Sequence, residues 1–279
     1  MRPSLQRVAT AAVGVPLVLA AIFLLPPRWF FVLLLAVVEV QVYEYVRLAR
    51  AWAPHAPLEA LLVLVPPAAL LLGPGALWLS PGEVPWEVLL LVVMTLSVGV
   101  GALVLLGGTP VDQSMSALGV FGFGLAYFSL PVASVHYLQG LDPWVLILLL
   151  LVVWCGDTAA YYVGRTWGRH RMAPTVSPRK TWEGSLANLV TAVAVGVAWS
   201  WWRVGGVGWE VPTIAALASI GGQIGDLVES MLKRGAGTKD SGALLPGHGG
   251  LLDRLDALMF AAPTLLIGIW LVGYEGVIR

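Results

Sequence analysis

The sequence predicts an all-α integral membrane protein with about nine transmembrane helices and two polar loops on the cytoplasmic side. Of its 279 residues, 58% are hydrophobic and only 11% are charged, whereas a soluble domain carries about 25% charged residues. The apolar residues gather in runs long enough to cross a bilayer as helices, which takes about 20 residues. Most charged residues lie in the connections between these runs, so composition and spacing indicate the same fold class.

Nine apolar runs define the expected helices, which cover residues 7–25, 28–48, 57–73, 85–107, 113–137, 143–165, 184–203, 210–233 and 251–273. The first run ends at Pro26-Pro27 without a small-x-small cleavage site, so we interpret it as a membrane helix and not as a signal peptide. The third run is short and contains Pro66-Pro67, so we expect a kinked or re-entrant element. Tryptophans near several run ends fit the membrane interface.

The distribution of lysine and arginine predicts the orientation. With the N-terminus in the cytoplasm, all of the 16 basic residues except Arg28, Arg203 and Arg279 fall on the cytoplasmic side, as the positive-inside rule requires. Two polar loops, 166–183 and 233–250, then face the cytoplasm. We divide the chain into an N-terminal membrane region, 1–140, that provides anchoring and packing, and a C-terminal region, 141–279, that contains both loops.

The eighth run places two acidic side chains in a membrane helix. Asp226 and Glu229 lie at helical spacing from Ser230 and Lys233, so these side chains share one face. A carboxylate at mid-span costs about 2.5–3.5 kcal/mol on insertion scales, and less near a helix end. A bound cation would make the arrangement favourable. The alternative is an internal ion pair between Glu229 and Lys233, which are spaced i, i+4.

The ninth run begins with two further acids, Asp253 and Asp256, just after Gly249-Gly250. Helix capping and the helix dipole would explain acids at this place, but two acids are more than capping requires. Together with Asp226 they supply the hard oxygen ligands that Mg²⁺ prefers when it also binds substrate phosphates. We therefore predict that Asp226, Asp253 and Asp256 hold Mg²⁺.

The loop between these two helices contains basic residues, namely Lys233, Arg234, Lys239 and Arg254. Basic side chains beside a metal-binding acid cluster suit a polyphosphate, because the cations neutralise the charge that the metal leaves. Glycines between Gly235 and Gly250 let backbone N–H groups approach an anion closely. A flexible positive-inside loop is the alternative, and it would explain the bases and glycines but not the acids.

The other loop follows the sixth run, in which Asp157 and Tyr161 lie beside a stripe of small residues. That stripe recurs at four-residue steps, at Gly156, Ala160, Gly164 and Gly168, and predicts close helix packing. Lys180, in the segment Ser177 to Ser185, is a candidate for holding a lipid phosphate. The bases from Arg165 to Lys180 fit a topology signal or an anionic-lipid patch equally well.

Other features exclude alternatives. Cys155 is the single cysteine, so there is no disulfide framework and no cysteine metal cluster. His248 is the only imidazole near the acids, so a transition metal fits poorly. The formal net charge is zero, which gives no global field for a nucleic-acid partner. Glu39 and Glu44 lie five residues apart in the second run and are expected to contact another helix or a dimer partner, outside the site.

The stretch from Ser230 to Asp256 resembles the phosphatidate cytidylyltransferase family, the CDP-diacylglycerol synthases. Every fixed position of that family's pattern is met here, at Ser230, Lys233, Arg234, Lys239, Asp240, Gly242, Pro246, His248, Gly249, Gly250, Asp253, Arg254 and Asp256. The family's D-T-x-A-Y and S-P-x-K-T-x-E-G motifs are matched by Asp157 to Tyr161 and by Ser177 to Gly184. The resemblance covers roughly residues 150–260.

The resemblance implies a Mg²⁺-dependent membrane enzyme that converts CTP and phosphatidate into CDP-diacylglycerol and pyrophosphate. It also implies a metal centre that can hold K⁺ as well, a homodimer, and a site open to cytoplasm and membrane. The layout fits a multi-pass protein of a bacterial inner membrane.

Residue roles follow from the resemblance together with the charges. The expected catalytic residues are Asp226, Lys233, Arg234, Lys239, Asp240, Asp253, Arg254 and Asp256. The expected substrate-binding residues are Ser177, Lys180, Thr181, Glu183, Ser230, His248, Gly249 and Gly250. Asp157, Tyr161 and Glu229 are expected to support them. Two other functions are weighed: a CDP-alcohol phosphatidyltransferase, whose D-G-x2-A-R pattern is absent, and an ion-coupled transporter, whose acids would lie near mid-membrane.

Overall fold

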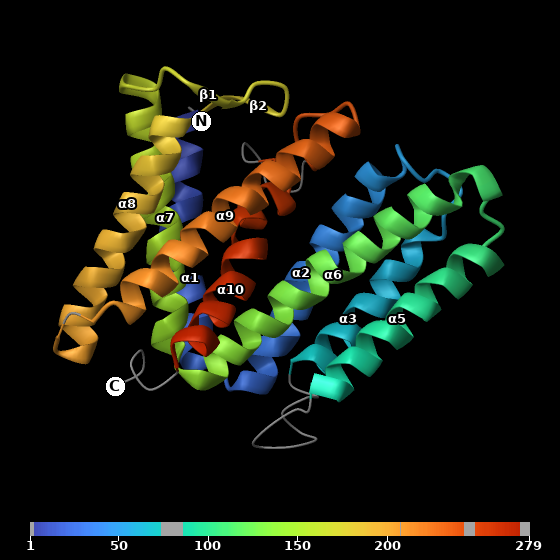
Figure 1. Cartoon of the computed structure of the whole chain (residues 1–279), viewed down its shortest axis with the longest axis horizontal. Helices are drawn as coiled ribbons and strands as arrows, with labels where there is room; N and C mark the ends of the chain where they lie inside the picture. The colour runs from blue at the N-terminus through green and yellow to red at the C-terminus, as the bar shows by residue number, and fades with distance from the viewer. Residues whose placement is uncertain (1–2, 74–85, 207, 243–248, 274–279) are drawn as a thin grey trace. The chain divides into compact units, whose positions relative to one another are not determined.

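The protein is described by a computed structural model that covers residues 3–73, 86–206, 208–242 and 249–273 (Figure 1). Its longer helices are α1 (Pro3–Leu24), α2 (Pro27–Ala49), α3 (Leu61–Leu72), α5 (Trp86–Leu106), α6 (Val111–Leu141), α7 (Pro143–Thr166), α8 (Trp182–Trp199), α9 (Glu210–Gly235) and α10 (Leu252–Val272). The predicted all-α membrane class is confirmed, and each of the nine expected runs contains a helix.

Six helices within the described residues are long and apolar enough to cross a membrane. They are Pro27–Ala49, Val111–Leu141, Pro143–Thr166, Trp182–Val204, Glu210–Gly235 and Leu252–Val272. Three shorter apolar helices, Ala12–Leu24, Leu58–Leu72 and Met94–Leu106, accompany them. The third expected span is a 3-10 turn (Leu58–Ala60) that continues into α3, a helix of 12 residues with Pro66 and Pro67 inside it.

The chain forms two compact units. The first unit takes residues 1–137 and 235–254, and the second takes 138–234 and 255–279. The second unit begins close to the boundary expected from the sequence, but 235–254 returns to the first unit. The residues expected to make one site are therefore shared between two units, and we describe each unit by itself.

The first unit is built around an aromatic cluster between α2 and α6. Tyr45 of α2 is buried, and its hydroxyl donates to the carbonyl of Val120 at 2.6 Å. Its ring packs edge-on against Phe128 of α6. Gly124 makes this contact possible, because a Cβ at that position would lie 2.6 Å from the Tyr45 ring. The phenol oxygen is thus satisfied by a backbone acceptor inside an apolar core.

In the second unit, α7 and α8 lie side by side (Figure 1), and small residues let them approach closely. A Cβ at Gly156 would meet the side chain of Asn188, and one at Gly184 would lie 2.9 Å from the carbonyl oxygen of Ala160. The close packing that the small-residue stripe predicts is therefore present. Asp142 caps the start of α7 by accepting from the backbone N–H of Trp144 at 2.9 Å.

The loop expected at 166–183 contains a small β-hairpin, which the sequence analysis did not predict. Strands β1 (Arg171–Ala173) and β2 (Ser177–Thr181) pair antiparallel, with Arg171 opposite Thr181. Strands of three and five residues are too short to show a readable alternation. The hairpin leads directly into α8, because Thr181 is its N-cap and accepts from the N–H of Gly184 at 3.2 Å.

Candidate active site

A cavity of about 700 Å³ lies within the second unit, beside the hairpin and the adjoining ends of α7 and α8. Its lining combines two carboxylates with basic side chains, and includes Asp157, Tyr161, Arg165, Arg171, Arg179, Lys180, Thr181, Ser185, Asn188, Gln223 and Asp226. Basic and acidic groups around one solvent-accessible space can bind both the phosphates and the cations of a substrate. Asp157, Tyr161, Lys180, Thr181 and Asp226 are thus predicted residues that the fold brings together.

Lys180 and Asp226 form the central ion pair of this cavity. The Lys180 Nζ lies 2.6 Å from Asp226 Oδ2, and both side chains keep about a third of their surface exposed, at 27% and 36%. Lys180 comes from the end of β2 and Asp226 from α9, so the hairpin sets the distance between them. An ion pair that faces an open cavity can exchange its partner for a substrate charge, since the desolvation cost is already small.

A chain of hydrogen bonds connects three helices behind this ion pair. Asn188 of α8 donates to Asp157 of α7 at 3.2 Å, and Ser219 of α9 donates to Asn188 at 2.7 Å. Gln223 donates to Ser219 at 3.2 Å and accepts from Ser185. Polar side chains inside membrane helices need such partners. The network therefore fixes the orientation of Asp157 at the cavity wall.

Asp256 of α10 approaches Asp226 because glycines bring α9 and α10 together. A Cβ at Gly225 would lie 2.7 Å from the Asp256 carbonyl oxygen, and one at Gly221 would meet Thr264. The carboxylates of Asp157, Asp226 and Asp256 interact electrostatically. Carboxylates that repel one another are stabilised when a cation binds between them. α9 and α10, which carry Asp226 and Asp256, thus pack closely in the second unit.

The predicted Mg²⁺ site stays a prediction, and only the fit of the residues present can be examined. Among the residues that the structure describes, no three His, Cys, Asp or Glu side chains come close enough together to hold a metal ion. Asp226 and Asp256 nevertheless fit Mg²⁺, which typically takes one or two carboxylates and fills its other positions with waters and phosphate oxygens. Asp253, the third predicted ligand, lies in the first unit, and the three-aspartate site stays a prediction.

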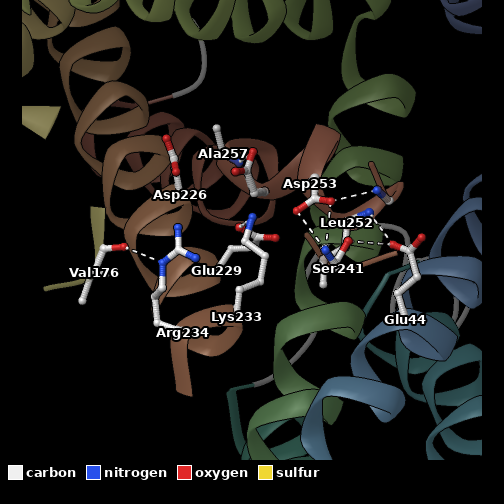
Figure 2. A network of polar contacts seen from close by, with 12 residues as sticks. Glu44, Val176, Asp226, Glu229, Lys233, Arg234, Ser241, Leu252, Asp253 and Ala257 are labelled. Carbon is white, nitrogen blue, oxygen red and sulfur yellow. Dashed lines mark hydrogen bonds and ion pairs between the residues drawn. The ribbon is translucent and has the colours of Figure 1, made fainter. Parts of the chain in front are cut away.

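The end of α9 carries two of the predicted basic residues. Lys233 pairs with Glu229 at 2.5 Å, and Glu229 is fully buried, so the internal ion pair considered as an alternative is present. Arg234 donates through Nε to the carbonyl of Val176 at 3.3 Å, which ties α9 to the turn of the hairpin (Figure 2). Ser230 is half-buried on the same helix.

In the first unit, two carboxylates hold the segment around Ser241 and Gly250 (Figure 2). Asp253 accepts from the backbone N–H of Ser241 at 3.0 Å and of Gly250 at 2.8 Å. Glu44 of α2 accepts from the Ser241 hydroxyl at 3.1 Å, from Leu251 N–H at 3.1 Å and from Leu252 N–H at 2.8 Å. Gly249 has a φ of 80°, a left-handed conformation that glycine adopts without strain.

The remaining predicted residues are placed as follows. Lys239, Asp240 and Arg254 are exposed in the first unit. Ser177 begins β2 and does not line the cavity. Glu183 accepts from the backbone N–H of His170, whose ring Nδ1 lies 2.6 Å away, so it ties the hairpin to α8. His248 lies outside the described residues.

Sequence reasoning missed Glu44 and the cavity arginines. Glu44 was expected to contact another helix or a dimer partner, and it does contact the start of α10; its bond to Ser241 was not foreseen. Its partners lie 197 to 208 residues further along the sequence, and no local sequence pattern predicts such a contact. Arg165, Arg171 and Arg179 were interpreted only as members of a basic run. Their place in the cavity lining depends on the hairpin, which was not predicted.

Comparison with known proteins agrees with this architecture. The profile of the cytidylyltransferase family matches residues 5–272. A Haemophilus influenzae protein named phosphatidate cytidylyltransferase is 34% identical over 279 aligned residues, covering 92% of this chain and 96% of that protein. A Brucella suis protein of the same name is 44% identical over 160 residues, which is 56% of this chain and 59% of the relative. The chain thus matches less than two thirds of the Brucella protein's length. The extent of the profile match and of the Haemophilus alignment shows that this chain belongs to the cytidylyltransferase family.

Proposed function

We propose that this protein is a phosphatidate cytidylyltransferase, which transfers CMP from CTP to phosphatidate and gives CDP-diacylglycerol and pyrophosphate. Family membership and the shared name of the Brucella, Haemophilus and Staphylococcus haemolyticus relatives support the activity. The observation that carries the proposal is the cavity of the second unit, in which Lys180 and three arginines face two carboxylates. Such a lining suits two polyanionic substrates that need neutralising cations.

The reaction needs positioning and charge neutralisation more than it needs a nucleophilic side chain. An oxygen of the lipid phosphate, already an anion, forms a new bond to the α-phosphorus of CTP. The bond from that phosphorus to the bridging oxygen breaks, and its electron pair leaves with pyrophosphate. Lys180 holds the lipid phosphate at the cavity, while Arg234, in the same unit, neutralises charge on the triphosphate. For Lys233, Lys239 and Arg254, neutralisation of the triphosphate and of the leaving group stays a prediction from the sequence.

The acids have a separate role, which is to hold a divalent cation on the nucleotide. Asp226 and Asp256, both in the second unit, would bind Mg²⁺; a third carboxylate from Asp253 stays a prediction from the sequence. Bound there, Mg²⁺ supplies Lewis-acid stabilisation of charge on the phosphate oxygens. Asp157, held by Asn188, orients the cavity wall beside Asp226. The proposal includes K⁺ as a second cation that the same centre can hold.

We place the protein in the inner membrane of a bacterium, as a homodimer with the cavity open to the cytoplasm. The bacterial origin of the relatives and the six long apolar helices support the membrane assignment. The positive-inside rule supports a cytoplasmic cavity, because the hairpin beside the cavity and the end of α9 are both rich in basic residues.

Activity in detergent tests the proposal. The full chain is purified and incubated with radiolabelled CTP and phosphatidate in mixed micelles, with Mg²⁺ or with a chelator. We expect label in a lipid-soluble product, release of pyrophosphate in equal amount, and loss of both with the chelator. Release of CMP would instead indicate a phosphatidyltransferase. Absence of both products, together with ion uptake by reconstituted vesicles, would refute the proposal in favour of a transporter.

A further inference from the structure

Glu44 is a carboxylate in an apolar helix that is fully engaged by a distant segment. Its side chain is only 5% exposed, although it lies in the span Pro27–Ala49. A charge in such a place is costly unless donors surround it. Here the donors come from the Ser241 hydroxyl and from the backbone of Leu251 and Leu252. Glu44 and its donors are far apart in the sequence, and this side chain joins α2 to the start of α10.

The contact takes the place of a helix cap. The first N–H groups of a helix have no acceptor within it, and a carboxylate near them also benefits from the helix dipole. α10 begins at Leu252, whose N–H donates to Glu44 Oε2 at 2.8 Å. The residue before it, Leu251, donates to Oε1 at 3.1 Å. Both oxygens of one carboxylate therefore bind successive backbone amides at the start of α10.

Two glycines are shaped to this carboxylate. A Cβ at Gly242 would lie 2.5 Å from Glu44 Oε1, and a Cβ at Gly250 would lie 2.6 Å from Oε2 and 2.1 Å from the Ser241 oxygen. Any other residue at these positions would displace the carboxylate or the serine. The room that Glu44 occupies thus gives a physical reason for glycine at both positions.

Ser241 connects Glu44 with Asp253. Its hydroxyl donates to Glu44 and its backbone N–H donates to Asp253 at 3.0 Å, as Figure 2 shows. We propose that Glu44 is a positioning residue: by fixing Ser241, Leu251 and Leu252 from α2, it sets the orientation of Asp253 and of the first turn of α10. The inference concerns turnover and so rests on the proposed function, but the geometry that it invokes is measurable without substrate.

Glu44→Gln tests the kinetic part. The amide keeps the shape but places an NH₂ group against a backbone N–H donor, so one of the two amides loses its acceptor. We expect kcat to fall about 10- to 100-fold, the range typical for residues that support a reactive group, with the KM for phosphatidate unchanged. Glu44→Asp keeps the charge but is one methylene shorter, and we expect an intermediate kcat. The unfolding midpoint is measured for each variant, and kcat is compared at a temperature where each variant is folded. A purely structural role would then leave kcat unchanged in both Glu44 variants.

Amide hydrogen exchange tests the geometric part in the absence of substrate. In Glu44→Gln, the peptide containing Gly249 to Asp253 should exchange about tenfold faster than in the unsubstituted protein, while peptides of α7 and α8 stay unchanged. This readout separates two failures. If the unsubstituted chain makes no CDP-diacylglycerol, the proposed function fails; if exchange at this peptide is unaltered in the variant, the assignment of Glu44 fails whatever the activity.

Glu39→Gln is the matched control. Glu39 lies on the same helix, and its Oε1 has no hydrogen-bond partner among the described residues, so the substitution should leave kcat and exchange unchanged. If Glu44→Gln does not fold, Glu44→Asp and Ser241→Ala each remove part of the same network and are measured in its place. Wild-type kcat and exchange in both variants, or exchange that rises equally throughout the chain, would overturn the proposal.

Discussion

The carboxylates of the two units are used in different ways. In the second unit, Asp226 faces an open cavity and pairs with the side-chain ammonium of Lys180. In the first unit, Glu44 and Asp253 accept mainly from backbone N–H groups around Ser241 and the start of α10. The partner of Asp226 is a mobile side chain, which a ligand can replace. The backbone N–H groups in the first unit would lose their acceptor if the carboxylate were removed. We therefore expect acids of the first kind to contribute mainly to turnover, and acids of the second kind to contribute to stability as well.

Asp226→Asn should have the largest effect on turnover with little effect on folding. The substitution removes the charge that would hold Mg²⁺ and leaves Lys180 without its counter-ion, so we expect turnover to fall about 10²- to 10³-fold. The pair is partly exposed, so the free energy of unfolding should change by less than about 1 kcal/mol. Pyrophosphate release and thermal unfolding in detergent measure the two quantities. Turnover within about threefold of the unsubstituted enzyme would rule out this role of Asp226.

Asp253→Asn should lower stability as well as turnover, and this separates the two units. The N–H groups of Ser241 and Gly250 both donate to Oδ2 of Asp253, at 3.0 and 2.8 Å. The amide oxygen of asparagine can take that position, but it accepts there without the negative charge. Loss of hydrogen bonds to a charged acceptor costs about 1.5–3 kcal/mol, so the unfolding midpoint should fall. The same two assays apply, run beside Asp226→Asn. If Asp253→Asn lost turnover at an unchanged midpoint, the comparison between the units would break down.

The helices were predictable because bilayer length imposes a strong and local signal. The apolar runs 143–165 and 210–233 place α7 and α9 within a residue or two of their observed ends. The small-residue stripe likewise predicted close helix packing at Gly156 and Ala160, since only residues without large side chains permit it. Asp226 was recognised as a candidate because a charge in a membrane helix is costly and therefore conspicuous.

What was not predictable depends on contacts between distant segments. The hairpin that carries Lys180 has strands too short for a periodic signal, so its pairing with Asp226 was not foreseen. The partners of Glu44 could not be named from the sequence, because its donors lie some 200 residues further along the chain. Two of those donors are backbone N–H groups, which every residue except proline has. A sequence pattern marks side chains, and it gives no sign of which amides need an acceptor.

Gly225→Ala is expected to have a smaller effect, on the geometry between two acids of the second unit. The added Cβ would lie 2.7 Å from the carbonyl oxygen of Asp256, so α9 and α10 must move apart. Overpacking of this kind lowers the free energy of unfolding by about 1–3 kcal/mol. Because the movement also misplaces the two acids, turnover should fall about tenfold. Gly101→Ala is the control, since nothing lies within 4 Å of a Cβ there. Equal behaviour of the two variants would contradict the assigned contact.

Arg203→Gln should have the smallest effect, although it too breaks a carboxylate–cation pair of the second unit. Arg203 lies 3.1 Å from Asp142 and stacks over Trp144 at 5.3 Å, at the start of α7 and just beyond the end of α8, whereas the cavity residues Asp157 and Ser185 lie toward the opposite ends of these helices. Asp142 keeps its capping bond to the Trp144 N–H, so we expect a loss of less than about 1 kcal/mol in the free energy of unfolding and turnover within about twofold of the unsubstituted enzyme. A tenfold loss of turnover would mean that ion pairs of this unit matter wherever they lie. Unchanged turnover would show that Asp226 and Lys180 owe their importance to facing the cavity, because the two pairs share the same chemistry and differ in what surrounds them.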